Sequence, residues 1–150
     1  MLLLTSTSDL LQVVTGSAVT TDVHASWVDN ASGTITPGRT NTAITGAATT
    51  TVVASPASGT QRNVQTLNIR NRHATSSVVI TVQHTDGTTT AALIQYTLLA
   101  GEMLQYVDSG GWRILNASGQ VKTEPTGASV TSTELSAVSA AAASAISIVS

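Results

Sequence analysis

The sequence predicts a mainly β protein: an antiparallel β-sandwich, of jelly-roll-like or small-barrel form, followed by a short C-terminal α-helix. Three observations support this fold class. Apolar and polar residues alternate with period two until about residue 120, as expected of half-buried strands. Turn-forming residues recur about every eight to twelve positions, which is typical of sandwiches and small barrels. A helical repeat of apolar residues first appears at residue 131.

The composition restricts the classes of function. Only 9% of the 150 residues are charged, far below the roughly 25% usual in soluble domains, so hydroxyl and amide side chains must supply the polar surface. So few charges protect a monomer poorly against self-association, and we expect partners to cover much of that surface. The net charge of -2 offers no basic footprint, so nucleic acid is not an expected partner.

The sequence indicates neither a membrane segment nor a redox role. No run approaches the ~20 apolar residues that a spanning helix needs. The opening MLLLTSTSDLL lacks the basic region of a signal peptide, so we expect the chain to work in solution without a membrane. Cys is absent, which excludes disulfides and thiolate metal sites.

The predicted strands follow one another between turn signals. In residues 19–29, mostly apolar side chains at odd positions alternate with polar ones at even positions, which gives the strand one buried face. Asp86-Gly87 marks a tight turn, because Gly accepts a positive φ. The last three strands are joined by short Gly-containing turns and predict a β-meander. Further strands are expected at residues 50–54, 64–72, 78–84, 91–99, 103–108 and 112–117.

Residues 29–50 interrupt the alternation. Gly, Pro, Asn and Thr dominate this segment, which predicts a long surface excursion with at most a short strand at 42–44. Aromatic residues make up only 3% of the chain, so Val, Leu and Ile must supply most of the core. Six side chains in the apolar phase of their strands are expected to be buried: Trp27, Ile69, Ile80, Val82, Leu104 and Trp112.

The end of the chain differs in composition from everything before it. Gly, Pro and charged residues cluster near residues 116–129 without an apolar repeat, which indicates a linker. Thr131 and Glu134 then have the spacing of a capping box, so a helix is expected to begin there. The sequence divides into a β-sandwich domain at 1–116, a linker at 117–130 and a C-terminal helix at 131–150.

The predicted helix carries an apolar a/d stripe over two heptads. A helix this short is marginal alone, so it must pack on its own β-domain, on the same helix of sister subunits, or in a groove of another protein. The stripe favours self-association of the helix, and the linker would let the helix reach a partner beyond its own β-domain. The expected oligomer or docking interface consists of Leu135, Val138, Ala142, Ala145 and Val149.

No set of residues indicates catalysis. His84 and Asp86 flank the expected turn, where Asp caps backbone amides and His lies on the surface, and no nucleophile elbow accompanies them. His24, His73 and His84 lack the close spacing of a zinc site, so solvated histidines are expected. The alternative is a metal on a symmetry axis, held by one His from each subunit.

The remaining charged residues also suggest structural roles. Arg70 and Arg72 share a strand face, as a solvated edge or as partners of an acidic patch on another protein. Solvated strand ends, not acid catalysts, are expected of Asp22, Asp29, Glu102 and Asp108. We therefore expect no enzymatic activity and no cofactor.

Four segments resemble a group of small virion proteins of tailed bacteriophages. They are VDNASGTITPGRTNTAI, VVASPASGTQRNVQTLNIRN, ITVQHTDGTT and LLAGEMLQYVDSGGWRILNASG. That group has a similar pattern of strand ladder, Asp-Gly turn, L-x-A-G-E hairpin and terminal G-W strand, and the likeness covers about residues 5 to 120. It implies a β-sandwich structural protein of the particle without enzymatic activity. Such domains serve as capsid decoration proteins, head fibres or anchoring domains of tail fibres.

The function expected from the sequence is a non-enzymatic structural component of a phage particle, as a capsid decoration or head-fibre protein. It would bind the virion surface as a homo-oligomer, in contact with the major capsid protein or another virion protein, after assembly in the host cytoplasm. A trimer is expected, because phage surfaces present local threefold axes and oligomers favour closed symmetry. The alternative is a tail-fibre anchor or a receptor- or carbohydrate-binding module, which should expose clustered aromatic side chains.

The C-terminal stripe leads to a first prediction. Val138→Asp places a carboxylate in each copy of the predicted helical seam, where the charges repel one another and lose hydration. We expect the oligomer to dissociate more readily than that of the unaltered chain, as measured by light scattering over a concentration series. An unchanged oligomeric state would show that this seam does not hold the oligomer together.

Overall fold

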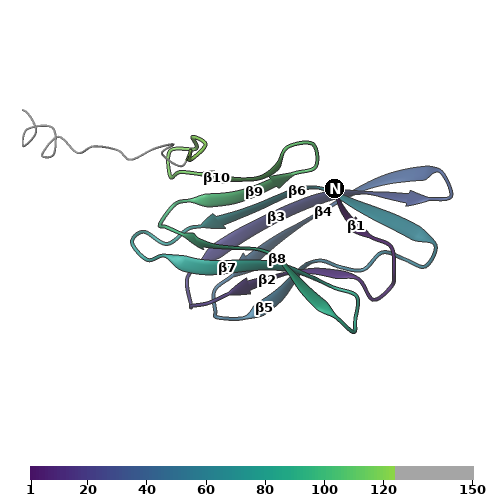
Figure 1. Ribbon diagram of the computed structural model, residues 1–150, viewed down its shortest axis with the longest axis horizontal. Helices are drawn as coiled ribbons and strands as arrows, with labels where there is room; N and C mark the ends of the chain where they lie inside the picture. Colours follow the sequence, from purple (N-terminus) through teal and green to yellow (C-terminus); the bar gives the residue numbers. More distant parts are fainter. Residues whose placement is uncertain (124–150) are drawn as a thin grey trace, which may run out of the picture.

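The computed structural model describes residues 1–123, which form ten β-strands and, within that range, no helix. Figure 1 shows these strands as two layers, with the N-terminus beside the strands of one of them. The strands are β1 (Leu2–Leu4), β2 (Leu10–Thr15), β3 (Thr21–Ala31), β4 (Thr34–Ile44), β5 (Thr49–Val53), β6 (Thr60–Asn71), β7 (Val78–Thr85), β8 (Thr90–Leu98), β9 (Met103–Val107) and β10 (Gly111–Leu115).

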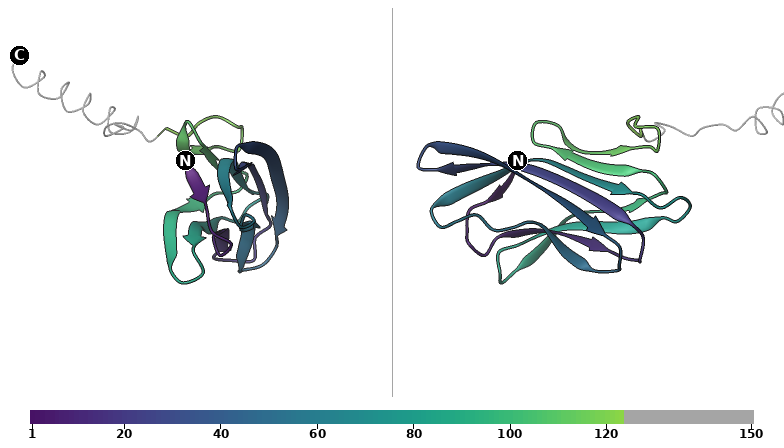
Figure 2. Two further views of the ribbon diagram at one scale, coloured as in Figure 1. Left: turned by 90° about the vertical axis from the view of Figure 1, so that its right-hand side faces the viewer. Right: turned by 180° about the vertical axis from the view of Figure 1, so that it is seen from behind.

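The strands form two antiparallel sheets that face each other (Figure 1, Figure 2). The six-stranded sheet has the order β10-β9-β6-β3-β4, and β1 pairs with the first part of β6. The four-stranded sheet has the order β5-β2-β7-β8. One cluster of buried side chains takes residues from both sheets. The mainly β, sandwich-like prediction is therefore confirmed, whereas the predicted helix at 131–150, with its stripe from Leu135 to Val149, lies outside the described residues.

The core consists of aliphatic side chains from the apolar phase of each strand. Four of the six predicted core residues are fully buried, namely Ile69, Ile80, Val82 and Leu104. Trp27 and Trp112 are only partly buried, so their predicted burial is wrong. Trp112 lies on the edge strand β10 against Tyr106, with ring centroids 5.1 Å apart, and Trp27 follows a register shift in β3 between Ser26 and Trp27.

The predicted surface excursion at 29–50 is wrong, because half of it forms the eleven-residue strand β4 and its first residues belong to β3. A tight turn at Ser32 and Gly33, with φ of 50° and 89°, folds β4 back along β3. The strand is mostly exposed, so its sequence needs no alternation of apolar residues. Pro37 is tolerated because β4 is an edge strand and the missing N–H leaves no ladder bond unmade.

The turns after β7 and β9 lie where the sequence predicted them, but the predicted β-meander of the last three strands is wrong. Gly87, with φ of 91°, closes the predicted hairpin between β7 and β8. β9 and β10 also form the expected hairpin. β8, however, belongs to the other sheet, so the connection between β8 and β9 crosses from one sheet to the other. Hydrophobic alternation is the same in both sheets and so could not reveal this crossing.

Two segments outside the predicted strands also form hydrogen bonds with strands of the sheets. β1 and β2 come from the opening of the chain, which the sequence analysis did not assign to strands. After β10, Val121 forms a bridge with Leu115, and the N–H of Lys122 donates to the carbonyl oxygen of Ile114 at 2.7 Å. The first residues of the predicted linker are therefore hydrogen-bonded to β10.

A cluster around Trp27 closes one end of the sandwich. The Arg62 guanidinium stacks over the Trp27 ring, with its carbon 4.5 Å from the ring centroid. The same guanidinium binds both carboxylate oxygens of Asp29 at 2.8 Å and donates to the carbonyl oxygen of Ala54. Gly38, opposite Trp27 on β4, leaves room for the indole because it has no Cβ.

Asn71 and Glu102 link the connections at another part of the fold. The buried Asn71 Nδ2 lies 2.8–3.2 Å from the carbonyl oxygens of Ser76, Leu98 and Leu99. The Glu102 carboxylate accepts the N–H of Leu99 at 3.0 Å. These bonds join the end of β6 to the crossing between β8 and β9.

The close packing of Gly38 against Trp27 leads to a second prediction. A Cβ at position 38 would lie well inside contact distance of the indole, over which the Arg62 guanidinium also stacks. Gly38→Ala should lower the free energy of unfolding by about 1–3 kcal/mol through overpacking. Gly46→Ala is the matched control, because a Cβ there meets open space, and it should change stability by less than about 1 kcal/mol. Urea unfolding followed by Trp fluorescence measures both, and equal stability of the two variants would contradict the packing argument.

Candidate binding surface

The outer face of the six-stranded sheet carries a row of polar side chains that crosses five strands. The strand registers place neighbouring members of the row directly opposite one another. In order across β4, β3, β6, β9 and β10, the row consists of Asn41, His24, Asn68, Gln105 and Arg113.

Hydrogen bonds hold this row in place. His24 Nδ1 lies 2.7 Å from Asn41 Oδ1, so the ring donates its Nδ1–H to this amide oxygen. Gln105 Nε2 donates to Asn68 Oδ1 at 2.6 Å, and Arg113 Nε donates to Gln105 Oε1. Because each side chain is held by its neighbour, a partner would meet an already ordered polar surface, and binding would order few additional side chains.

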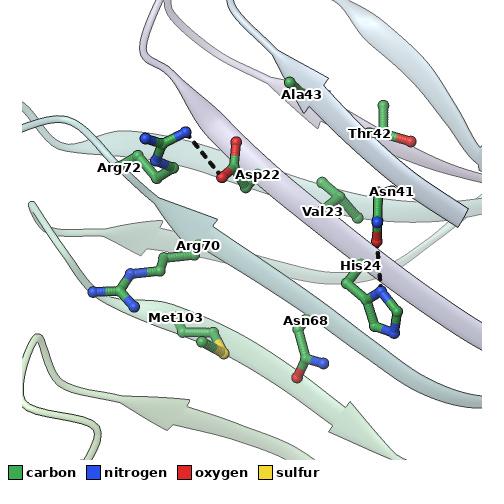
Figure 3. Close-up of a pocket in the computed structure, with 10 residues that line it drawn as sticks. All are labelled: Asp22, Val23, His24, Asn41, Thr42, Ala43, Asn68, Arg70, Arg72 and Met103. Carbon is green, nitrogen blue, oxygen red and sulfur yellow. Dashed lines mark hydrogen bonds and ion pairs between the residues drawn. The ribbon is translucent and has the colours of Figure 1, made fainter.

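Charged residues border the row at the end of β6. Arg72 forms an exposed ion pair with Asp22, with 3.2 Å between Nη1 and Oδ2. Arg70 is exposed and has no ion-pair partner within residues 1–123. Figure 3 shows Arg70 between its two register partners, Met103 of β9 and Asp22 of β3, with Arg72 paired with Asp22. This part of the surface therefore offers a free guanidinium next to a polar row.

These side chains surround an open hollow of about 580 Å³ (Figure 3). Its lining includes Asp22, His24, Asn41, Asn68 and Arg70. The lining of this hollow contains neither Trp nor Tyr, and its one ring is the His24 imidazole, which is hydrogen-bonded to Asn41. Arginine and amide donors at an open surface suit carboxylate groups, and the hollow is best matched to an acidic side chain of a partner protein.

Within residues 1–123, His84 and Asp86 have different surroundings. Asp86 is exposed in its turn and accepts the N–H groups of Thr88 and Thr89 at 2.8 and 2.7 Å, as expected. His84 is not the solvated surface residue that was expected, because its Nε2 is buried 3.9 Å from Asp9 Oδ1. Asp9, which the sequence analysis did not single out, is buried and accepts the N–H groups of Thr5 and Ser6.

The three histidines lie apart from one another. His24 belongs to the polar row, whereas His73 Nδ1 accepts the N–H groups of Thr75 and Ser76. In residues 1–123, no group of three or more His, Asp or Glu side chains is arranged to hold a metal ion.

Several predicted solvated strand ends are instead paired. Asp29 is bound by Arg62, and Glu102 is buried against Lys122, with 3.1 Å between Oε1 and Nζ. The hydrogen bond to Glu102, followed by one to the Tyr96 hydroxyl, raises the pKa of Lys122 above its ordinary value. The solvated interpretation is therefore wrong for Glu102 and Asp29, because a basic side chain is paired with each carboxylate and Glu102 is buried.

Comparisons with protein-family models, curated proteins and solved structures found no match to this chain. Over residues 1–123, no helix is long and apolar enough to cross a membrane. The fold and the surface chemistry are therefore the basis for a functional proposal.

The turn at Asp86 leads to a third prediction. The backbone N–H groups of Thr89 and Thr88 stabilise the ionised carboxylate and hold the pKa of Asp86 below its ordinary value of 3.8. A lowered pKa in the folded state stabilises the protein above pH 3.8, and this contribution is lost as the pH falls through the folded-state pKa. We expect a carboxyl NMR titration to give a pKa below 3.8 for Asp86. The stability advantage over Asp86→Asn should shrink at the same low pH, and an Asp86 pKa at or above 3.8 would contradict the assignment.

Proposed function

We propose that this protein is a non-enzymatic structural component of a tailed-bacteriophage particle, of the capsid decoration or head-fibre type. It binds the virion surface as a homo-oligomer, in contact with the major capsid protein or another virion protein. The resemblance of its strand and turn segments to small phage virion proteins supports this proposal. The sandwich-like fold is compatible with it.

The distribution of charged residues between the two sheets is the observation that supports a docking function. The strands of the four-stranded sheet contain no Asp, Glu, Lys or Arg, so the charged strand residues all belong to the other sheet. On or beside the polar face of that sheet lie four of the chain's six Lys and Arg residues, namely Arg39, Arg70, Arg72 and Arg113. Asp22 is the acidic residue in the hollow.

This uneven distribution favours a docking role. A face with several guanidinium groups and an ordered amide row is complementary to an acidic protein surface. It is also broad, because five neighbouring strands contribute to it. The carbohydrate-binding alternative receives less support, because the Trp and Tyr side chains pack in or beside the core and not in the hollow.

The proposed role leads to a fourth prediction. In particles of the encoding phage purified by density gradient, quantitative mass spectrometry should find the chain at a fixed copy number relative to the major capsid protein. A ratio consistent with oligomers on capsid sites supports the proposal, and a chain absent from intact particles overturns it.

The same particles, prepared without this protein, allow the docking face to be tested. Arg70→Glu should weaken binding to them by about tenfold, since it reverses a free charge on the proposed face. Thr51→Glu adds a carboxylate to the opposite sheet, where Thr51 is exposed, and should leave binding nearly unchanged. Equal binding of both variants would show that another face docks.

A further inference from the structure

The edge strand β8 differs from the other sheet edges of the described protein. An edge strand presents unpaired N–H and C=O groups on its outer side, and proteins usually block such edges. β8 is nine residues long and forms one edge of the four-stranded sheet. Within residues 1–123, no strand pairs with its outer side.

Each of the edge strands β4, β5 and β10 has a feature that hinders pairing with a further strand. β4 contains Pro37 and Arg39, which discourage pairing with another strand. On β5, the carbonyl oxygen of Val52 accepts the Thr40 hydroxyl from β4 at 2.9 Å. On β10, the carbonyl oxygen of Ile114 accepts the N–H of Lys122. The edge of β8 is therefore the one that the described chain leaves available.

The sequence of β8 also lacks the usual protection. TAALIQYTL contains no charged residue and no Pro. A register shift at Leu93 separates the start of the strand from the segment 94–98, which pairs regularly with residues 78–82 of β7. The regular segment, which lies beyond this irregularity, is thus an uncharged edge of five residues.

Exposed apolar side chains surround this edge. Leu93 is 38% exposed, Leu99 is 52% exposed, and Val79 of the neighbouring β7 is 40% exposed. Beside the first part of β8, an open hollow of about 190 Å³ is lined by Met1, Leu3, Leu93 and other mostly apolar residues. Among the seven exposed large hydrophobic residues of the described range 1–123, Met1, Leu3 and Leu93 line this hollow, Val79 lies opposite Thr97 of β8, and Leu99 directly follows β8. Such clustering marks interaction surfaces.

We infer that two copies of this chain pair through β8, antiparallel to each other across a two-fold axis. Their two four-stranded sheets then form one continuous sheet of eight strands. A second copy fits this edge because the unpaired backbone groups of an edge strand are complementary to those of the same edge turned by 180°. The paired strands themselves bring no like charges together, since the strands of this sheet contain no Asp, Glu, Lys or Arg. Lys122 Nζ does reach β8, 3.2 Å from the Tyr96 hydroxyl, but its charge is paired with Glu102.

The side-chain pattern of the regular segment suits this pairing. With Tyr96 opposite its own copy, Ile94 faces Leu98 of the second copy, and Gln95 faces Thr97. Ile94, Tyr96 and Leu98 contact or belong to the core, whereas Gln95 and Thr97 are exposed. Apolar residues therefore oppose apolar residues and polar residues oppose polar ones across the axis.

The inference is independent of the proposed function, because it depends only on the edge and its composition. The contact it describes is two-fold. The trimer expected from the sequence would need a contact elsewhere in the chain.

A pair of Thr→Lys substitutions in the full chain tests the inference. Thr97→Lys puts a lysine on the β8 edge of each copy, so that two like charges enter one contact. Natural edge strands often carry lysine, which hinders pairing in the same way. Thr51→Lys is the matched control, because Thr51 is an exposed Thr on the opposite edge strand β5. Sedimentation velocity over a concentration series should give a dimer for the unaltered chain and for Thr51→Lys. The dimer of Thr97→Lys should be at least about tenfold weaker.

Hydrogen exchange of the same samples reports on the backbone. Amides of residues 94–98 that point outward should exchange more slowly as the dimer forms, and those of β4 should not change. A monomeric chain at all concentrations overturns the inference, as does an oligomer that Thr97→Lys leaves unchanged. Dissociation by Val138→Asp together with no effect of Thr97→Lys would also overturn it, by assigning the contact to the C-terminal stripe.

Discussion

The structure depends on packing small aliphatic side chains between two sheets. With no Phe, no Cys and few other aromatic residues, the chain obtains its core from Leu, Ile and Val on both sheets. Burying each such side chain contributes roughly 1.5–3 kcal/mol, so many must be buried together. This requirement explains why the apolar phase of almost every strand points inward, and why the two Trp residues lie at the margins and not at the centre.

Polar side chains hold the ends of this core together. Asn71 joins the end of β6 to the crossing between the sheets, and Arg62 joins Asp29 to Trp27 at a margin of the core. Lys122 covers the buried Glu102 and reaches the Tyr96 hydroxyl on β8. A buried polar group costs free energy unless its partners are present, so these contacts specify how the connections run as well as stabilising them.

The two sheets present different chemistry to a partner. The outer face of the six-stranded sheet has guanidinium groups and an ordered amide row, whereas the four-stranded sheet has uncharged strands and an open edge at β8. The charged face suits an electrostatic contact, whose strength depends on salt concentration. The uncharged edge suits a contact made by backbone hydrogen bonds. The proposed docking face and the inferred dimer contact therefore use different sheets.

The sequence by itself determined the mainly β class, most of the strands from β3 onward and the Asp86-Gly87 turn, because period-two alternation and turn residues are local signals. It could not reveal β4, since an exposed edge strand needs no apolar alternation, nor that β8 and β9 belong to different sheets. The row from Asn41 to Arg113 is likewise invisible in the sequence, because its members lie on five strands and meet only through their registers. Only the tertiary structure decided these features, because strand pairing is set by contacts between residues far apart in the chain.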